Sequence, residues 1–320
     1  MNALRLDDLG LPIKFKTIFK KTFLLYRSHF LSVISLSALA YLPFLLLEPF
    51  TDDPQFVVFV ETLHGCFLDV IIFLTLPTIF IHKKIFPIAT LQIFFQRFFA
   101  SSVIISVVQF FALIVIGIMI FMKLAISVLA IGTQAAGGIP FLIIFIPISI
   151  AILVVGFIPY IKLIFSGFFL ILGNETKLID VKRNLLSSIQ LLKTSLFPVL
   201  IAIFKITILI SIPVFIFMNW YLMNHPEVTA LIKSFDTQQP AMGEKMIETQ
   251  LEMINIVFKI LQEPNFAIGR ILIHCLVRPI KSIFLCILFL SLMMRFNPDS
   301  IKSYFSIQTP DTTEVEETED

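Results

Sequence analysis

Six long apolar runs constrain this chain more than any other feature of its sequence. A helix of about 20 apolar residues crosses the hydrocarbon core of a bilayer, and each run reaches or exceeds that length. The runs are continuous rather than alternating, which argues against a transmembrane β-barrel. The sequence therefore predicts an all-α, polytopic membrane protein with six transmembrane helices, at residues 30–50, 61–81, 102–122, 140–172, 196–222 and 271–294.

The composition leaves too few polar residues to cover a soluble domain of this size. Of the 320 residues, 58% are hydrophobic and 14% are charged, against about 25% charged residues in a typical soluble domain. The formal net charge is +2, so there is no overall charge with which to bind nucleic acid. The position of each charge along the chain is therefore more informative than the sum.

Basic residues are concentrated in alternate connections between the predicted spans. The N-terminus, residues 82–100, residues 173–195 and the C-terminal tail carry most of the lysines and arginines outside the spans. The long connection 223–269 carries only Lys233, Lys245 and Lys259, with Arg270 at its end. By the positive-inside rule, this asymmetry places both termini in the cytoplasm. It predicts a multi-pass protein of the bacterial cytoplasmic (inner) membrane.

A short amphipathic segment with basic residues precedes each odd-numbered span, at about residues 11–27, 87–99 and 177–194. The chain thus divides into three hairpin units, each preceded by an interfacial helix. An apolar face with a basic rim is typical of a helix at the headgroup level, and the cations suit an anionic inner leaflet. The alternative is that these are ordinary cytoplasmic connections. The predicted lipid contacts are Lys14, Lys20, Lys21, Arg27, Arg97, Lys182 and Arg183.

Helical spacing predicts the apolar face of two of these segments. In the first segment the face consists of Leu11, Phe15, Phe19, Thr22, Phe23 and Tyr26. In the third it consists of Leu178, Val181, Leu185, Ile189 and Leu192. The first segment is expected to remain in the mature protein. Apolar sequence resumes at Tyr41 after the cleavage-like Ala38–Ala40, and the region before the apolar run is too long for a signal peptide and contains Asp7 and Asp8.

The two remaining connections of interest are a long outer loop and an acidic tail. The loop, residues 223–269, contains apolar residues at a helical spacing, which predicts an amphipathic helix that either acts as a lid or packs over the helix ends. These residues are Ile247, Leu251, Ile254, Phe258 and Leu261. The membrane domain is expected to end at residue 306, and the acidic tail 307–320 is expected to be disordered and cytoplasmic.

Five ionisable residues fall well inside the predicted spans, where charges are costly and mark candidate functional sites. They are Asp69, Lys162, Lys205, Arg278 and Lys281. At 1.5 Å per residue, Asp69 lies about 20 Å from the inner edge, Lys281 about 21 Å and Arg278 about 25 Å. Asp69 can therefore pair with either cation, leaving positive charge that could hold an anionic headgroup or a phosphate-bearing solute. The alternative is that the lysines snorkel and one structural pair forms.

Motifs of catalysis and metal binding are absent from the sequence. There is no P-loop, no GxGxxG after a strand, no HExxH and no GxSxG. Cys66, Cys275 and Cys286 form no CxxC pair. Glu61 and His64 form a lone ExxH, which is a weak pattern without further ligands. We therefore expect neither an enzyme nor a bound cofactor or metal.

Three stretches give the chain a resemblance to a bacterial six-span family. Residues 19–30 followed by Tyr41–Pro43 resemble the start of that family, residues 181–193 resemble its basic helix before the fifth span, and residues 279–295 resemble its last span. The family includes the membrane domain fused to some glycerophosphoryl diester phosphodiesterases, together with free-standing relatives of uncharacterised role. The resemblance covers most of residues 11–306.

The chain departs from the family pattern in two places. Asn184 and Leu185 stand where the family often has Ser-Trp, and Ser291–Met294 replaces a Tyr-rich ending. The soluble phosphodiesterase barrel with its catalytic residues is absent. The resemblance thus implies an integral membrane domain without the enzyme. We expect a non-enzymatic protein that binds membrane lipids or partners in envelope organisation, or alternatively a transporter or exporter of an anionic or amphipathic solute.

Overall fold

The computed structural model describes residues 14–45, 68–72, 75, 103–104, 106–107, 110, 158–172, 179–230, 256, 259–260 and 263–307. Within these residues the chain is helical, with short turns and no strand, so the all-α fold class is confirmed for the described part. The chain forms two compact units. One contains residues 1–14, 73–201 and 286–320, and the other contains residues 15–72 and 202–285.

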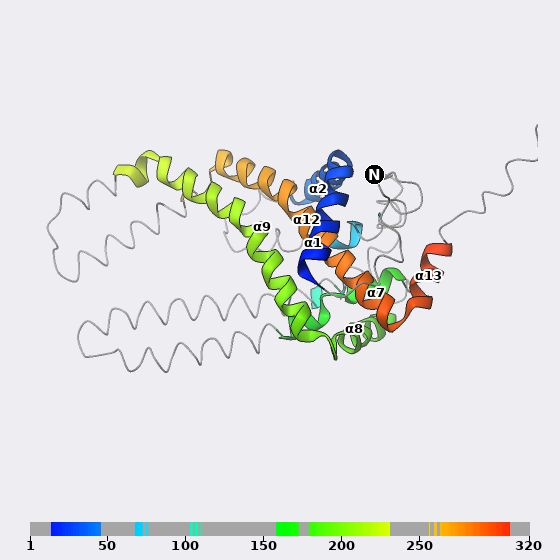
Figure 1. The fold of residues 1–320 in the computed structure, drawn as a ribbon. Helices are drawn as coiled ribbons and strands as arrows, with labels where there is room; N and C mark the ends of the chain where they lie inside the picture. Colours follow the sequence, from blue (N-terminus) through cyan, green and yellow to red (C-terminus); the bar gives the residue numbers. More distant parts are fainter. Residues whose placement is uncertain are drawn as a thin grey trace, which may run out of the picture. The chain divides into compact units, whose positions relative to one another are not determined.

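Two helices are long and apolar enough to cross a membrane (Figure 1). Helix α9 covers Leu196–Asn224 and helix α12 covers Pro264–Phe296. The apolar part of each has 29 residues, and these parts contain the predicted fifth and sixth spans. Pro213 and Pro279 lie inside the two helices, as is common where neighbouring groups can satisfy the freed carbonyls of a membrane helix. The described residues are thus compatible with residence in a membrane.

A third candidate for a membrane crossing is bent. Helix α1 (Phe15–Ser28) and helix α2 (Phe30–Leu45) meet at His29, and the chain bends there by 88°. Backbone hydrogen bonds continue through the bend, from His29 N–H to the Leu25 carbonyl at 3.1 Å and from Val33 N–H to the His29 carbonyl at 2.9 Å. The bend lies where the sequence predicts an interfacial helix to give way to the first span.

Helix α1 lies along the middle of α12 and runs in the opposite direction. The rings of Phe15 and Phe284 have centroids 5.4 Å apart, and the Tyr26 hydroxyl donates to the Leu276 carbonyl at 2.7 Å. The buried face of α1 is Ile18, Thr22, Leu25 and Tyr26. Thr22 and Tyr26 belong to the predicted face, whereas Ile18 and Leu25 are buried outside it and Phe23 remains half exposed.

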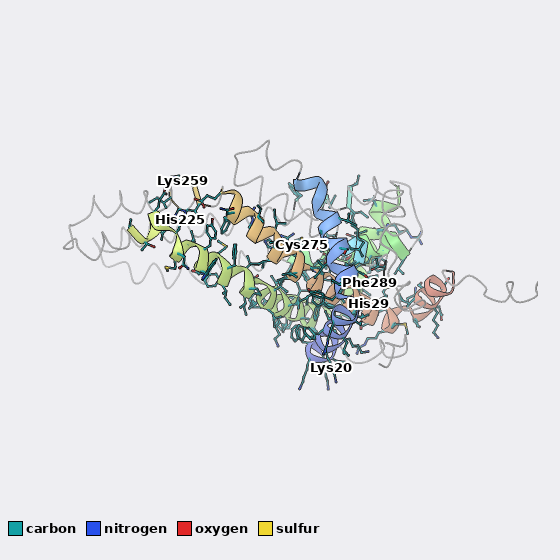
Figure 2. All side chains as sticks on the ribbon, turned by 90° about the horizontal axis from the view of Figure 1, so that it is seen from above. Lys20, His29, His225, Lys259, Cys275 and Phe289 are labelled. Atoms are coloured by element: carbon teal, nitrogen blue, oxygen red, sulfur yellow. The ribbon has the colours of Figure 1, made fainter. Side chains whose placement is uncertain are left out.

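The core of the other unit forms around a break in the predicted fourth span. The chain is helical over 158–163, turns at residues 164–165 and continues as α7 (Ser166–Leu172). Phe289 of α12 is fully buried there against the rings of Phe165, Phe168 and Phe169, with centroids 5.2 to 5.5 Å away (Figure 2). The turn divides the longest of the predicted spans, 140–172, which exceeds the length that a bilayer requires.

Helix α8 (Ile179–Leu192) packs against α7, and of its predicted face Val181 and Leu192 are buried and Leu185 is partly buried. Asn184 and Ser188 are buried, whereas 49% of Leu186 and 36% of Ile189 are exposed. The Ser188 hydroxyl donates to the Lys162 carbonyl at 2.6 Å, just before the turn at 164–165. A hydroxyl that satisfies a carbonyl next to a helix break explains why a polar residue faces inward.

One described helix was not predicted from the sequence. Helix α13 covers Pro298–Ile307 and contacts α7. Its start carries ordinary capping signals, since the Asn297 side chain accepts from the Ser300 N–H at 3.3 Å and Pro298 occupies the first position. The predicted interfacial helix 87–99 and the tail from residue 308 lie outside the described residues, as does most of the loop helix over 247–261.

Candidate functional site

Three of the five predicted intramembrane charges come together in one unit. The Asp69 carboxylate lies within hydrogen-bonding reach of the Ser282 hydroxyl and within electrostatic reach of Lys281 and Arg278. Ser282 also lies 3.4 Å from the Arg278 carbonyl, one helical turn earlier. Because Lys281 and Arg278 are three residues apart on α12, they share a face that a single carboxylate can approach. We call Asp69, Arg278 and Lys281 the charge cluster.

The charge cluster continues along α12 through a histidine that the sequence did not indicate. The Arg278 Nε–H group donates to the Nδ1 atom of His274 at 3.3 Å. A ring nitrogen that accepts a hydrogen bond carries no proton. His274 in this geometry is therefore neutral, with its proton on Nε2. The signal in the sequence is a spacing of four residues, which places His274 and Arg278 on one face.

The other two intramembrane lysines have different surroundings. The Lys205 ammonium lies over the Phe15 ring, 5.8 Å from its centroid, and its side chain is exposed on α9. This cation–π contact lets an exposed ammonium keep a favourable partner. Lys162 belongs to the unit that contains Phe289, where its side chain is partly buried and its carbonyl accepts from Ser188. Neither contact involves Asp69.

Most of the predicted lipid-contacting residues are exposed. Lys14, Lys20 and Arg27 are exposed on or beside α1, and Lys182 and Arg183 are exposed on α8 (Figure 2 labels Lys20). Lys21 is partly buried, and Arg97 lies outside the described residues. The two exposed faces also carry large apolar side chains, namely Phe23 and Leu24 on α1 and Leu186 and Ile189 on α8.

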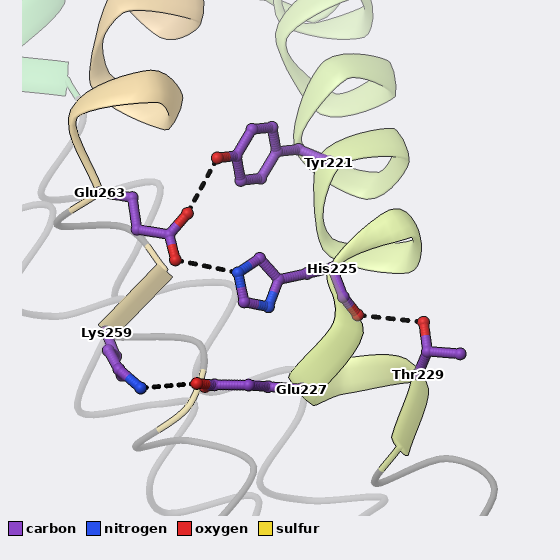
Figure 3. A network of polar contacts seen from close by, with 6 residues as sticks. All are labelled: Tyr221, His225, Glu227, Thr229, Lys259 and Glu263. Atoms are coloured by element: carbon purple, nitrogen blue, oxygen red, sulfur yellow. Dashed lines mark hydrogen bonds and ion pairs between the residues drawn. The ribbon is translucent and has the colours of Figure 1, made fainter.

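A second polar site joins the end of α9 to the start of α12 (Figure 3). The Tyr221 hydroxyl donates to the Glu263 Oε2 atom at 2.9 Å. The His225 Nε2 atom lies 2.9 Å from Oε1 of the same carboxylate, and a carboxylate only accepts, so Nε2 carries a proton. Tyr221 and His225 are four residues apart, so both reach Glu263 from the same face of the chain.

An exposed ion pair flanks this site. The Lys259 ammonium donates to Glu227 Oε1 at 2.6 Å, and this hydrogen bond raises the pKa of Lys259. The Thr229 hydroxyl lies 3.0 Å from the His225 carbonyl, which also accepts from the Thr229 N–H, and 3.2 Å from the Met223 carbonyl in the last turn of α9. Together these contacts order the first residues after α9.

We call the three residues of the polar site itself, Tyr221, His225 and Glu263, the carboxylate clasp.

The carboxylate clasp predicts a pH dependence of stability. The Tyr221 hydrogen bond is the largest cause that lowers the pKa of Glu263, followed by the hydrogen bond and charge of His225. A carboxyl group with a depressed folded-state pKa stabilises the fold above its unfolded pKa, and that contribution is lost as the pH falls through the folded value. We expect Glu263→Gln to lower unfolding free energy near pH 7 by less than about 1 kcal/mol, because the site is partly exposed.

This difference should disappear in acid. Unfolding of the wild type and Glu263→Gln would be compared in detergent from pH 7 down to below about 4, where a free glutamate is protonated. Glu227→Gln is the matched control, since it removes the neighbouring exposed carboxylate. A Glu263→Gln effect that stays constant with pH would contradict the prediction.

The carboxylate clasp was missed because its residues are far apart in sequence. Tyr221 lies at the end of the predicted span 196–222, His225 lies at the start of the loop 223–269, and Glu263 lies near the other end of that loop. The Tyr-x3-His spacing indicates a shared face but no partner. Among the described residues, no group of three or more His, Cys, Asp and Glu side chains has a geometry that could hold a metal ion.

Comparison of the chain with protein-family models, with curated proteins and with solved structures finds no match. Its function must therefore be argued from the charge cluster, the exposed faces of α1 and α8, and the carboxylate clasp. The resemblance of residues 11–306 to a six-span family remains a prediction.

Proposed function

We propose that this chain is a six-span, multi-pass protein of the bacterial cytoplasmic membrane that binds anionic lipids and acts without catalysis, in envelope organisation. The observation that carries this proposal is the exposed face of α8. Lys182 and Arg183 are exposed there beside Leu186 and Ile189. Apolar side chains flanked by cations suit the boundary between acyl chains and anionic headgroups.

The position of α8 along the chain supports the same proposal. Only the turn 193–195 separates it from α9, and the Lys193 and Ser195 N–H groups donate to the Gln190 and Leu192 carbonyls across this turn. Since α9 is apolar from Leu196 onward, α8 must lie close to one end of a membrane helix. Lys182, Arg183 and Lys193 are then close to the headgroups, where each contributes about 1 kcal/mol of attraction to anionic lipid.

Helix α1 supports the proposal less directly. Its contacts with Leu276 and Phe284 place it beside the central part of the predicted sixth span. A helix at that depth reaches the headgroup level only if α12 is steeply tilted, or if the stems of Lys20 and Arg27 extend towards the surface. The lipid-binding proposal therefore depends mainly on α8.

A second candidate function is the transport or export of an anionic or amphipathic solute. The grouping of Asp69, Arg278 and Lys281 favours it, because ionisable residues inside a membrane commonly mark a substrate or ion pathway. In this alternative the two cations would attract the solute and Asp69 would balance part of their charge. Uptake of a labelled anion into proteoliposomes, lost in Lys281→Met, is the result that would favour transport over lipid binding alone.

Lipid retention on α8 can be measured by native mass spectrometry. The protein would be released from nanodiscs that contain phosphatidylcholine and phosphatidylglycerol. We expect the amount of phosphatidylglycerol retained by the variant Lys182→Gln/Arg183→Gln/Lys193→Gln to fall at least about tenfold below that of the wild type. The reason is that three cations that attract the anionic headgroups are removed. Retention of phosphatidylcholine should not change.

The matched control removes three lysines from the predicted opposite side of the membrane. It is the variant Lys233→Gln/Lys245→Gln/Lys259→Gln, which alters the net charge equally. Equal loss of phosphatidylglycerol in both triple variants would show a general charge effect and would overturn the proposal that α8 binds lipid.

A further inference from the structure

Exposed cations lie on α8, on the turn after it and on α13. Lys182 and Arg183 are exposed on α8, Lys193 is exposed in the turn 193–195, and Lys302 is exposed on α13. Within the part of the chain that the structure describes, none of the three lysines forms an ion pair. Such a surface attracts anions, whether they belong to lipid or to protein. We call Lys182, Arg183 and Lys193 the basic face of α8.

Helix α13 and the basic face of α8 belong to the same unit of the chain. Both α8 and α13 contact α7 (Figure 1). The axes of packed helices lie about 8–10 Å apart, and α7 has 7 residues, or about 10 Å of length at 1.5 Å per residue. The parts of α8 and α13 that contact α7 are therefore no more than about 30 Å apart.

The chain continues from α13 into an acidic segment that lies outside the described residues. This segment, residues 308–320, carries six acidic side chains and no lysine or arginine. The acidic residues are Asp311, Glu314, Glu316, Glu317, Glu319 and Asp320. We call residues 308–320 the acidic tail. An extended chain covers at most about 3.5 Å per residue, so Glu314 can lie up to about 25 Å and Asp320 up to about 45 Å from the end of α13 at Ile307. The acidic tail can thus reach the basic face of α8 while α13 stays on α7.

We propose that the acidic tail docks on the basic face of α8 and competes there with anionic lipid headgroups. The competition rests on the proposed function, whereas the docking does not. Opposite charges on an exposed surface contribute little pair by pair. The acidic tail is covalently attached, however, so its effective concentration near α8 is of the order of millimolar. It therefore occupies the basic face where anionic lipid is scarce and leaves it where anionic lipid is abundant.

Docking can be measured in detergent without added lipid. A carbodiimide joins a carboxylate to a lysine where the two groups meet, and peptide mass spectrometry identifies the joined residues. We expect cross-links from the acidic tail to Lys182 and Lys193 in about 10 mM salt, where the Debye length is about 30 Å. They should decrease at least about threefold in about 1 M salt, where it is about 3 Å.

Two results of this cross-linking would overturn the docking. The first is the absence of cross-links between the acidic tail and Lys182 or Lys193. The second is equal cross-linking to Lys233 and Lys245 of the loop 223–269, which would show that the acidic tail meets lysines at random. Cross-links to Lys302 are expected from its nearness in the sequence and are not counted.

Competition with lipid would be measured by retention of phosphatidylglycerol after release from nanodiscs. The variant Glu314→Gln/Glu316→Gln/Glu317→Gln/Glu319→Gln keeps the length of the acidic tail but removes most of its charge. It should retain about threefold more phosphatidylglycerol than the wild type, as expected on losing a weak competitor of millimolar effective concentration. The same four changes should have no effect when Lys182, Arg183 and Lys193 are also replaced by Gln, because the docking surface is then gone.

The matched control removes four carboxylates from the loop 223–269, which is predicted to lie on the opposite side of the membrane. It is the variant Asp236→Asn/Glu244→Gln/Glu248→Gln/Glu252→Gln, which alters the net charge equally. Phosphatidylglycerol retention should change less than about 1.5-fold, because the bilayer is thicker than the Debye length. An equal rise in both quadruple variants would show a general charge effect and would overturn the competition.

The same measurements separate this inference from the proposed function. If the cross-links form but neither the neutralised tail nor the triple Gln variant of α8 alters phosphatidylglycerol retention, lipid binding by α8 fails and the docking stands. If the triple variant loses phosphatidylglycerol but no cross-links form, the docking fails and lipid binding stands. If the cross-links form and the triple variant loses phosphatidylglycerol while the neutralised tail retains no more of it than the wild type, the competition is overturned.

Discussion

Replacing Phe289 with alanine should lower the free energy of unfolding by about 3 kcal/mol. The side chain is fully buried, and its ring contacts Phe165, Phe168 and Phe169. Alanine would leave a cavity among three rings that belong to a broken helix and to α7. This loss is at the lower end of the range measured for Phe→Ala changes in the cores of soluble proteins. In a membrane protein the side chain gains little from leaving water, because lipid is as apolar as the core, so the lost packing contacts account for most of the destabilisation.

Phe197→Ala is the control for this prediction. Phe197 lies on α9 with 73% of its surface exposed, so its removal leaves no internal cavity and should change stability by less than about 0.5 kcal/mol. Both variants would be unfolded in mixed detergent micelles and followed by circular dichroism. Similar small effects for the two phenylalanines would show that the aromatic core around Phe289 does not hold this unit together.

Features encoded by local sequence could be predicted, and the two membrane-capable helices are the clearest case. The apolar run that begins at Leu196 starts at the residue where α9 starts, because length and hydropathy alone decide such a segment. Local signals also mark the start of α13, where Asn297 precedes the helix and Pro298 is its first residue. That helix was overlooked because the prediction followed hydropathy rather than capping.

The faces of α1 and α8 were predicted only in part, because long-range packing decides the rest. Periodicity placed Ile189 inside, yet α8 buries Ser188, whose hydroxyl is required by the carbonyl of Lys162, 26 residues away. Similarly, α1 buries Leu25, which the predicted face left out, next to Tyr26, whose hydroxyl reaches a carbonyl of α12. A carbonyl that needs a donor from a distant segment has no signature in the sequence of that segment.

The two candidate sites also differ in how far the sequence could predict them. Estimates of depth from the helical rise placed Asp69 level with Lys281 and Arg278, and the structure brings these three residues together. The same estimates could not separate them from Lys205, since depth says nothing about which way a side chain faces around its helix. The carboxylate clasp could not be predicted for another reason. Glu263 and His225 are connected by a long loop, and the sequence does not specify the path of that loop.

The C-terminal half of α9 and the N-terminal part of α12 meet at a glycine, Gly269, and replacing this glycine should separate the two helices. A Cβ atom at Gly269 would lie 2.4 Å from Cζ and 2.9 Å from Cε2 of Phe217. The Phe217 ring cannot simply turn aside, because it stacks on Phe266 at 5.6 Å and contacts Tyr221 at 5.9 Å. Alanine favours a helix over glycine by up to about 1 kcal/mol, whereas overpacking costs about 1–3 kcal/mol.

We therefore expect Gly269→Ala to destabilise the protein by about 1–2 kcal/mol, with overpacking outweighing helix propensity. The double variant Phe217→Leu/Gly269→Ala tests the cause. Leucine shortens the side chain at the point of contact, so the added methyl group then fits and the double variant should be more stable than the sum of the single changes predicts. Strict additivity in unfolding measurements would mean that Phe217 and Gly269 do not touch. Such a result would contradict the close approach of α9 to α12 at Gly269, which also brings Tyr221 near Glu263.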